Sequence, residues 1–367
     1  MNKNGEAEKK QDYRVEKDSI GTKDVPQNVY YGVQSLRAAE NFHITGLNMH
    51  PEIINSLAYI KKAAAITNCE IGMLDKKKAK AIVQACDEIL EGKLHGDFIV
   101  DPIQGGAGTS LNMNANEVIA NRAIEILGGE KGDYSIINPN DDVNCGQSTN
   151  DVIPTAGKMT SLRLLKNLKK ELLRLHKALC AKAKEFDHVI KMGRTQMQDA
   201  VPIRLGQEFN AYSVAVMRDI HRMDRAMEEM CTLNMGGTAV GTGINADEAY
   251  LRRIVPNLVE VSDMEFVQAY DLIDATQNLD PFVAVSGAVK ACAVTLSKIA
   301  NDLRLMSSGP RAGFGEINLP AKQNGSSIMP GKVNPVIPEV VNQVAFNVIG
   351  NDVTITMAAE AGQLELN

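Results

Sequence analysis

The segment Leu165–Leu179, with the sequence LKNLKKELLRLHKAL, decides the fold that this chain predicts. Its leucines are separated alternately by three and four residues, which is the spacing of a narrow seam along one side of a long helix. The seam consists of Leu165, Leu168, Leu172, Leu175 and Leu179. Lysines crowd the other faces, which we expect to meet solvent or other subunits. We predict one helix from Thr155 to about Phe186, packed against other long helices in a bundle.

The composition of the whole chain favours the same class of fold. Of its 367 residues, 44% are hydrophobic but only 4% are aromatic, and Trp is absent. Strands are rich in aromatic and β-branched residues, so this composition favours helices packed on helices over an all-β fold. We therefore expect a mainly α protein. Its predicted parts are a disordered tail over residues 1–12, a smaller helical N-terminal domain over 13–150 and a central helical-bundle domain over 151–367.

Two apolar segments near the C-terminus predict further long helices. Asp280 and Pro281 suit the N-cap and the first position of a helix that reaches about Met306. Its most apolar run, Pro281–Leu296, contains Lys290, so we expect the centre of a soluble bundle and no membrane span. Pro338 begins the last helical run, and we expect the chain to stop within that helix.

Charge and cysteine usage limit the partners and the compartment. The formal net charge of -6 is spread along the chain without a basic stripe, which argues against nucleic acid as a partner. The six cysteines show no C-x-x-C spacing, and the N-terminus is polar without a secretory signal. We expect reduced thiols in a cytoplasmic protein that does not bind membranes.

Four polar blocks that contain glycine or hydroxyl residues interrupt the helical segments. They occupy residues 104–110, 138–151, 192–199 and 325–335. The first block is a poor phosphate-binding loop because no Lys follows Gly108, which makes a nucleotide-binding module the weakest hypothesis. The second block precedes the long helix and supplies N-capping residues, but one helix start needs only one or two caps. Its surplus hydroxyls and amides therefore predict a ligand.

The fourth block, GSSIMPGKVNP over residues 325–335, carries the most specific signal. Its two glycines and two prolines exclude a helix or a strand, so its hydroxyls and its lysine lie on a loop of the kind that covers or forms an active site. The block resembles the signature of the fumarase/aspartase superfamily, whose members eliminate a group from succinyl-type substrates to release fumarate. The resemblance covers nearly the whole chain from Arg14 onward.

That resemblance implies more than the loop. It implies a bundle of long central helices and a homotetramer whose sites draw residues from several subunits. We expect no cofactor and no metal-binding residues. The resemblance also implies a C-terminal domain of roughly a hundred residues, which this chain lacks.

The reaction of such an enzyme requires many hydrogen-bond donors. Removing a proton next to a carboxylate yields a dianionic enediolate (aci-carboxylate), which only fixed donors around that carboxylate can stabilise. Thr109, Ser148, Thr149, Thr195 and Gln196 have the right chemistry for this task. Lys332 and Asn334 suit the second carboxylate, and Asn150 suits the leaving group. These substrate-binding roles also match the motifs of the superfamily position by position.

The general base is harder to assign from the residues. None of the four blocks contains a histidine, and a serine acts as a base only where its alkoxide is stabilised. The residues alone do not distinguish Ser326 from Ser327. The resemblance implies that the first serine of the signature, Ser326, is the catalytic base.

Several positions favour the aspartase branch of the superfamily. Gln196 and Asp142 stand where most fumarases have histidine, and Ile328 with the segment 336–343 also resembles aspartases. The resemblance therefore implies reversible deamination of L-aspartate to fumarate and ammonia, by anti-elimination. A fumarate hydratase and a non-catalytic scaffold with a lyase fold remain the alternatives.

Overall fold

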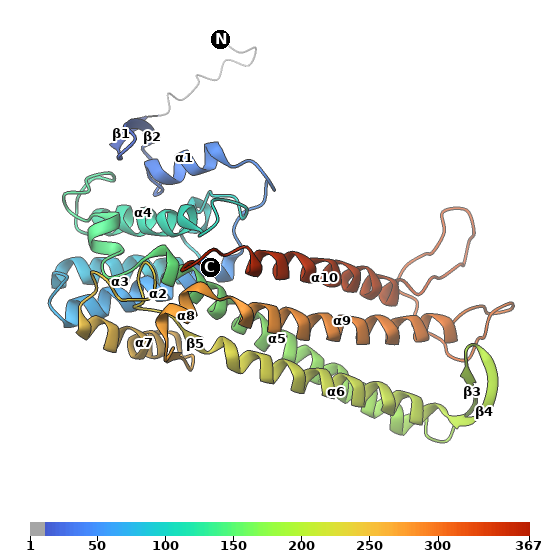
Figure 1. Ribbon diagram of the computed structural model, residues 1–367. Coiled ribbons are helices and arrows are strands. Elements are labelled where there is room, and N and C mark those ends of the chain that lie inside the picture. The colour runs from blue at the N-terminus through green and yellow to red at the C-terminus, as the bar shows by residue number, and fades with distance from the viewer. Residues whose placement is uncertain (1–11) are drawn as a thin grey trace, which may run out of the picture. The chain divides into compact units, whose positions relative to one another are not determined.

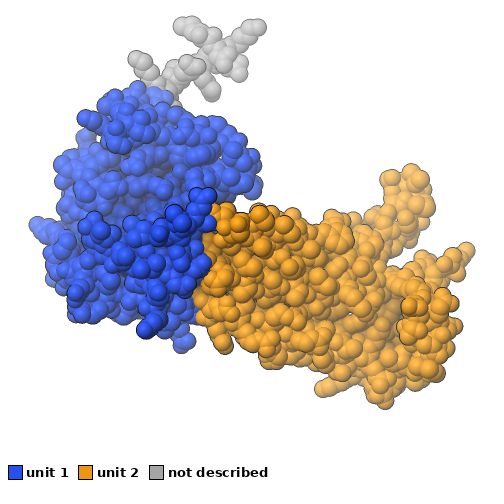
Figure 2. Space-filling view, in the orientation of Figure 1, with its two compact units in different colours: residues 1–161, 231–278, 362–367 blue, residues 162–230, 279–361 orange. Residues whose placement is uncertain are grey.

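A computed structural model describes residues 12–367 of this chain (Figure 1). The predicted tail over residues 1–12 lies, apart from Asp12, outside the described residues. The mainly helical fold is confirmed, since the strands form only two-stranded pairs. The chain divides into two compact units: unit 1 comprises residues 1–161, 231–278 and 362–367, and unit 2 comprises 162–230 and 279–361 (Figure 2). This division falls at residue 161, where the sequence suggested 150, and it returns residues 231–278 to the first unit.

Unit 1 combines short helices with two pairs of strands. Its elements are β1 (Tyr13–Lys17), β2 (Thr22–Pro26), α1 (Val33–Asn41), α2 (Pro51–Glu70), α3 (Lys76–Leu90), η1 (His95–Asp97), α4 (Thr109–Ile126), η2 (Pro139–Val143), the start of α5 (Thr149–Glu185), β5 (Thr232–Leu233), α7 (Glu248–Ser262), β6 (Val267–Gln268) and α8 (Leu272–Gln277). Strands β1 and β2 pair antiparallel, whereas β5 and β6 pair parallel.

Helix α2 lies at the centre of the contacts in unit 1, because it packs against α3, α4 and α7. Leu57 and Ile60 are fully buried on it. The helix begins after His50, whose Nδ1 accepts the backbone N–H of Glu52 over 3.1 Å. This histidine is therefore the N-cap of α2.

Unit 2 is a bundle of long helices. It contains most of α5, the strands β3 (Ile190–Thr195) and β4 (Gln198–Arg204), and the helices α6 (Leu205–Met230), α9 (Asp280–Met306) and α10 (Val336–Glu360). Figure 1 shows α6, α9 and α10 lying side by side, and α9 packs against both of the others. The long connection 307–335 between α9 and α10 carries the GSSIMPGKVNP block.

The leucine seam is buried only in part. Leu165, Leu172 and Leu179 are buried, whereas Leu175 is 36% exposed. The buried leucines are seven residues apart, so the partners within this chain cover one half of the seam. The helix itself begins at Thr149 and ends at Glu185, close to the predicted bounds.

The two C-terminal helices compare differently with the expectations. Within the described residues, α9 is long and apolar enough to cross a membrane by length and composition alone, a test that the central helix of a soluble protein also passes, so the expected bundle helix is not contradicted. The expectation that the chain stops within the last helix was wrong, because α10 ends at Glu360; beyond it, the backbone N–H of Asn367 bonds to the carbonyl of Thr276 in unit 1.

The block 192–199 forms a β-hairpin that the sequence did not predict. Strands β3 and β4 pair antiparallel, with Thr195 opposite Gln198. Gln196 and Met197 between them have φ angles of 49° and 69°. Positive φ at both central residues is the pattern of a type I′ turn, which matches the twist of the strands but normally uses Asn and Gly. The sequence lacks that signal, which explains why the hairpin was missed.

Candidate active site

The first group of predicted site residues lies at two helix N-termini in unit 1. Thr109 is the first residue of α4, Thr149 is the first residue of α5, and Ser148 precedes it. The two ends are neighbours, because a Cβ atom on Gly108 would lie 3.0 Å from Cγ2 of Ile153 in α5. Gly108 has a φ of 77°, so the turn into α4 requires glycine. Two adjacent helix N-termini favour a negatively charged ligand.

Hydrogen bonds leave the hydroxyl hydrogens of this group available. Nδ2 of Asn112 donates to Oγ1 of Thr149 over 3.1 Å, and the backbone N–H of Asn150 donates to Oγ of Ser148 over 3.2 Å. Each hydroxyl oxygen accepts a bond within the protein and keeps its hydrogen for another partner. Both residues line a cavity of about 400 Å³. A carboxylate in this cavity would meet two hydroxyl donors.

Asn150 contacts the glycine-rich loop that faces this cavity. Its Nδ2 donates to the carbonyl of Ala239 over 2.6 Å, and its own carbonyl accepts Nδ2 of Asn234 over 3.0 Å. The side-chain nitrogen is therefore used to hold the loop. A contact between Asn150 and a leaving group would have to use its Oδ1 atom.

Two buried charges lie behind the hydroxyls, Lys61 on α2 and Asp151 on α5. The Asp151 carboxylate accepts the backbone N–H groups of Ser148, Gly236 and Thr238 at 2.9, 3.1 and 3.1 Å. Burial raises the pKa of Asp151 to about 7 and lowers the pKa of Lys61 to about 7. The attraction between the two opposes both shifts. The cavity is thus backed by a pair of ionisable groups that solvent does not reach.

The second group of predicted residues lies in unit 2, at the hairpin and the long loop. Thr195 and Gln196 are exposed at the tip of the β3–β4 hairpin. Ser326, Lys332 and Asn334 lie on the loop 307–335, and Figure 1 shows the hairpin and this loop at the same end of the bundle. The structure therefore gathers the predicted residues into two groups, one in each unit.

Ser326 differs from Ser327 in its backbone environment. Oγ of Ser326 accepts the backbone N–H groups of Ile328 and Met329 over 3.2 and 3.1 Å. Two N–H donors stabilise negative charge on an oxygen and so favour an alkoxide. Ser326 is half-buried and Ser327 is exposed. This difference is the structural reason to prefer Ser326 as the base.

The loop closes on itself around Gly325. The carbonyl of Gly325 accepts Nδ2 of Asn334 over 3.1 Å, and its N–H donates to the carbonyl of Lys332 over 2.8 Å. A Cβ atom on Gly325 would lie 2.7 Å from the Asn334 side chain, so glycine is required there. Asn334 thus braces the loop, while the exposed Lys332 side chain projects its charge from it.

A group of ion pairs holds the start of the loop to the hairpin. Glu316 in the loop pairs with Arg194 and, over 3.2 Å, with Lys191, both of which lie on β3. Lys191 also pairs with Glu208 over 2.9 Å, and Arg194 lies 4.5 Å from the ring centre of Phe314. Since Arg194 precedes Thr195, these contacts tie the hairpin group to the loop group within unit 2.

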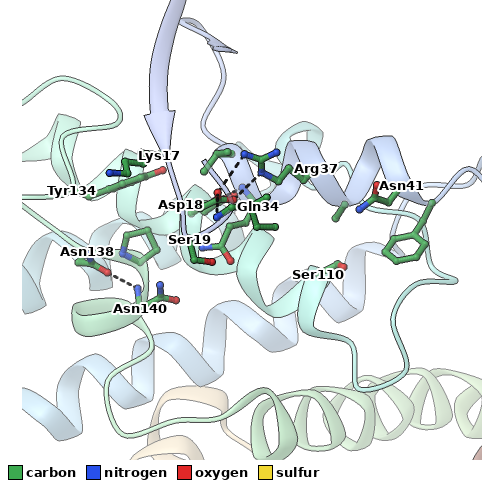
Figure 3. Close-up of a pocket in the computed structure, with 16 residues that line it drawn as sticks. Lys17, Asp18, Ser19, Gln34, Arg37, Asn41, Ser110, Tyr134, Asn138 and Asn140 are labelled. Atoms are coloured by element: carbon green, nitrogen blue, oxygen red, sulfur yellow. Dashed lines mark hydrogen bonds and ion pairs between the residues drawn. The ribbon is translucent and has the colours of Figure 1, made fainter. Parts of the chain in front are cut away.

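A further cavity in unit 1, of about 420 Å³, does not include the predicted residues (Figure 3). Its described walls contain Ser110 and Asn140, which belong to two of the polar blocks, but none of the predicted site residues. Figure 3 shows Arg37 turned toward Asp18, and its Nε donates to Oδ2 over 2.9 Å. Because this carboxylate pairs with the guanidinium, the cavity offers an anion little net charge.

Sequence reasoning missed the groups that support the site from behind. Lys61 follows an apolar helical pattern and belongs to no polar block, so no local signal identifies it. Glu316 lies before the GSSIMPGKVNP block in a segment without a recognisable pattern. Among residues 12–367, no group of three or more His, Cys, Asp or Glu side chains could hold a metal ion.

Comparison with known proteins places the chain among lyases. A family model described as "Lyase" matches residues 21–350. The chain is 60% identical to an aspartate ammonia-lyase of Bacillus subtilis (strain 168) over 356 residues, which cover 97% of this chain and 75% of the relative. It is 52% identical to an aspartate ammonia-lyase of Escherichia coli (strain K12) over 357 residues, with 96% and 75% covered.

Solved structures share the fold. A fumarate lyase:delta crystallin from Brucella melitensis, bound to cobalt, is 54% identical with a TM-score of 0.94, and the match covers 97% of this chain and 78% of that one. The class II fumarase of Schistosoma mansoni is 38% identical with a TM-score of 0.93, over 97% and 78% of the two chains.

Proposed function

Because this chain belongs to the fumarase/aspartase family of lyases, we propose that it converts L-aspartate reversibly into fumarate and ammonia. The observation that carries this proposal is the pair of donor groups: hydroxyls at two helix N-termini in unit 1, and a serine that accepts two backbone N–H groups in unit 2. The aspartate ammonia-lyases to which the chain is similar support the choice of substrate.

In the proposed reaction Ser326 removes a proton from the carbon next to the carboxylate that lies farther from the amine. The N–H groups of Ile328 and Met329 stabilise its alkoxide before the proton is taken. The electrons left on the substrate move into the adjacent carboxylate and form the enediolate. Breakage of the C–N bond on the opposite face then releases ammonia and leaves fumarate.

The donors share the work of holding the two carboxylates. Thr109, Ser148 and Thr149, with Thr195 and Gln196, stabilise the enediolate, and the first three act with the help of the helix dipoles. Lys332 and Asn334 bind the second carboxylate, and Asn150 contacts the amine. Removal of one such donor typically costs on the order of 3–4 kcal/mol in the barrier.

We propose that several chains build each site and that the active form is a homotetramer. Helix α10 supports this, because apolar side chains such as Val344 and Phe346 are 58% and 64% exposed. Exposed apolar faces of this kind mark interfaces. The part of the leucine seam that this chain leaves exposed, at Leu175, also fits an interface with another subunit.

We also propose the cytoplasm as the location of the protein, because its six cysteines are free thiols.

The decisive experiment follows fumarate by its ultraviolet absorbance with L-aspartate or L-malate as the substrate. We expect fumarate and an equal amount of ammonia from L-aspartate, and little product from L-malate. Turnover of L-malate alone would show a fumarate hydratase. A folded, tetrameric protein that acts on neither substrate would favour the non-catalytic scaffold.

A further inference from the structure

Lys61 is a lysine on α2 whose side chain is fully buried. Its Nζ donates to Oδ1 of Asn144 over 2.8 Å and to Oε1 of Gln147 over 3.0 Å. Lysine is almost never buried this completely unless its charge is used by a partner. Both partners lie in the polar block before α5, so Lys61 connects the core of unit 1 to the proposed site.

Asn144 passes the influence of Lys61 to α4. Its Nδ2 donates to the carbonyl of Gln147 over 3.1 Å, which leaves its Oδ1 facing the lysine. Oδ1 of Asn144 also accepts hydrogen bonds from Nδ2 of Asn112 and from Nδ2 of Asn116, each over 3.2 Å. The two ends of an amide are nearly equal in size, so hydrogen bonds alone determine which end faces which neighbour. Nζ of Lys61 donates to Oδ1 and the Gln147 carbonyl accepts from Nδ2, so these two bonds together fix the orientation of Asn144.

Asn112 passes this orientation to the proposed substrate contact. Its Nδ2 also donates to Oγ1 of Thr149, so that the Thr149 hydroxyl accepts from the protein and donates elsewhere. Oδ1 of Asn112 and Oδ1 of Asn116 are buried and accept no hydrogen bond from the residues that the structure describes. An unpaired buried carbonyl is unfavourable. Turning either amide over would set its oxygen against Oδ1 of Asn144, so the orientation of Asn144 opposes this.

We propose that Lys61 is a positioning residue for the proposed reaction: through Asn144 and Asn112 it keeps the Thr149 hydroxyl a hydrogen-bond donor toward the substrate carboxylate. This inference rests on the proposed function. Without the lysine, Asn144 keeps only its bond to the Gln147 carbonyl, so Asn144 and Asn112 turn more readily, and a turned Asn112 accepts the Thr149 hydroxyl. Its lone pairs would face the carboxylate and repel it at the step where negative charge increases.

The test is a double-mutant cycle between Lys61 and Thr149, read as kcat/KM for L-aspartate. We expect Lys61→Met to lower kcat/KM about tenfold, which corresponds to the loss of one oriented hydrogen bond. In the Thr149→Val background the same change should lower it by less than about twofold, because the hydroxyl that Lys61 orients is absent. A lysine that only supports the fold would lower kcat/KM equally in both backgrounds, and that result would overturn the inference.

Lys158 provides the matched control. It is 4% exposed in the same unit, and its Nζ donates to the carbonyl of Thr232 over 2.7 Å, a residue that is not part of the network. Lys158→Met should keep kcat/KM within about twofold of the wild type. Equal losses for Lys158→Met and Lys61→Met would also overturn the inference.

Two further outcomes are separable from these. If Lys61→Met does not fold, Asn112→Ala breaks the link to Thr149 while Lys61 stays paired, and the same cycle with Thr149→Val applies. Wild-type protein that releases no fumarate from L-aspartate would overturn the proposed function and this inference together. Active wild-type protein without coupling in the cycle would overturn only the inference.

Discussion

The donors of unit 1 and those of unit 2 are held in opposite ways. Behind Thr149 stand Asn112, Lys61 and Asp151, which are 1%, 0% and 0% exposed. Around Ser326 the loop bonds mainly to its own backbone, and the neighbouring Ile328 is 83% exposed. A buried network fixes the direction of its dipoles before a ligand arrives, whereas an exposed loop can move to admit one. The comparison suggests that unit 1 supplies hydrogen-bond donors in fixed orientations, whereas unit 2 supplies Ser326 on a loop that can move.

Removal of the proposed base should produce the largest effect. Ser326→Ala should lower kcat for L-aspartate about 10³-fold, because a positioned base typically contributes 10²–10⁴-fold. The thermal midpoint should stay within about 2 °C, since the loop has little packing to lose. Fumarate absorbance and a thermal melt on the same sample measure both quantities.

Ser327→Ala is the natural control for this change. Ser327 is exposed, and within residues 12–367 no backbone N–H donates to its Oγ, so kcat should stay within a few-fold of the wild type. Loss of activity from Ser327→Ala with Ser326→Ala still active would exchange the two assignments. It would also remove the reason to contrast the loop with the buried network.

The ion pairs at the start of the loop should have the next largest effect. Glu316→Gln removes the charge that pairs with Arg194 and Lys191, which is worth about 1–3 kcal/mol for a hydrogen-bonded, partly buried charge. We expect kcat to fall roughly tenfold and amide hydrogen exchange across residues 307–335 to accelerate. Such a result would show that the loop depends on this anchor for its productive position.

Asp199→Asn is the control, because it removes the weaker, exposed ion pair of the same arginine, Arg194. Asp199 lies 3.9 Å from Arg194 and is 76% exposed in its side chain, so its pair with the arginine is weak. Activity and hydrogen exchange should match the wild type. If Asp199→Asn slowed the enzyme as much as Glu316→Gln, burial of the pair would not be what matters.

The burial of Lys61 in unit 1 should make the free energy of unfolding depend on pH. The pKa of Lys61 falls from 10.5 to about 7 on folding, mainly because of burial, while Asp151 on α5 and Cys86 on α3 act to raise it. Between these values the unfolded chain binds more protons than the folded one. Stability due to this group therefore rises with pH in that window, by at most about 1.4 kcal/mol per pH unit.

The measurement compares urea unfolding of the wild type and Lys61→Met between about pH 7 and 10. The difference in free energy of unfolding, wild type minus variant, should grow with pH. Removal of the lysine also raises the pKa of Asp151 further, which acts in the same direction. A difference that stays constant would mean that Lys61 keeps its ordinary pKa, and hence that water reaches the network.

The contrast between the units also explains what the sequence could predict. Loop 325–335 carries its polar groups within eleven residues, so Ser326 and Lys332 could be proposed as site residues from local pattern and resemblance. The bulk of the fold followed from the leucine seam in the same way. Lys61, in contrast, acts on Thr149 only because α2, α4 and α5 fold together. No spacing in the sequence predicts that contact. The sequence also did not predict that residues 231–278 pack in unit 1, because that packing too depends on segments far apart in the chain.

The smallest expected effect comes from a change in the turn of the β3–β4 hairpin in unit 2, and it tests whether this turn moves during the reaction. Gln196 and Met197 hold φ angles of 49° and 69°, where a side chain costs about 1 kcal/mol relative to glycine. Met197 is 52% exposed, so Met197→Gly gives up little packing and should raise the stability of the hairpin by up to about 1 kcal/mol. Hydrogen exchange of residues 190–204 would measure it, with the exposed Met73→Gly as a control in unit 1. If the turn tightens and kcat is unchanged, the strain at Met197 has no part in the reaction. A fall in kcat with a more stable hairpin would instead show that the turn must move between substrate binding and product release.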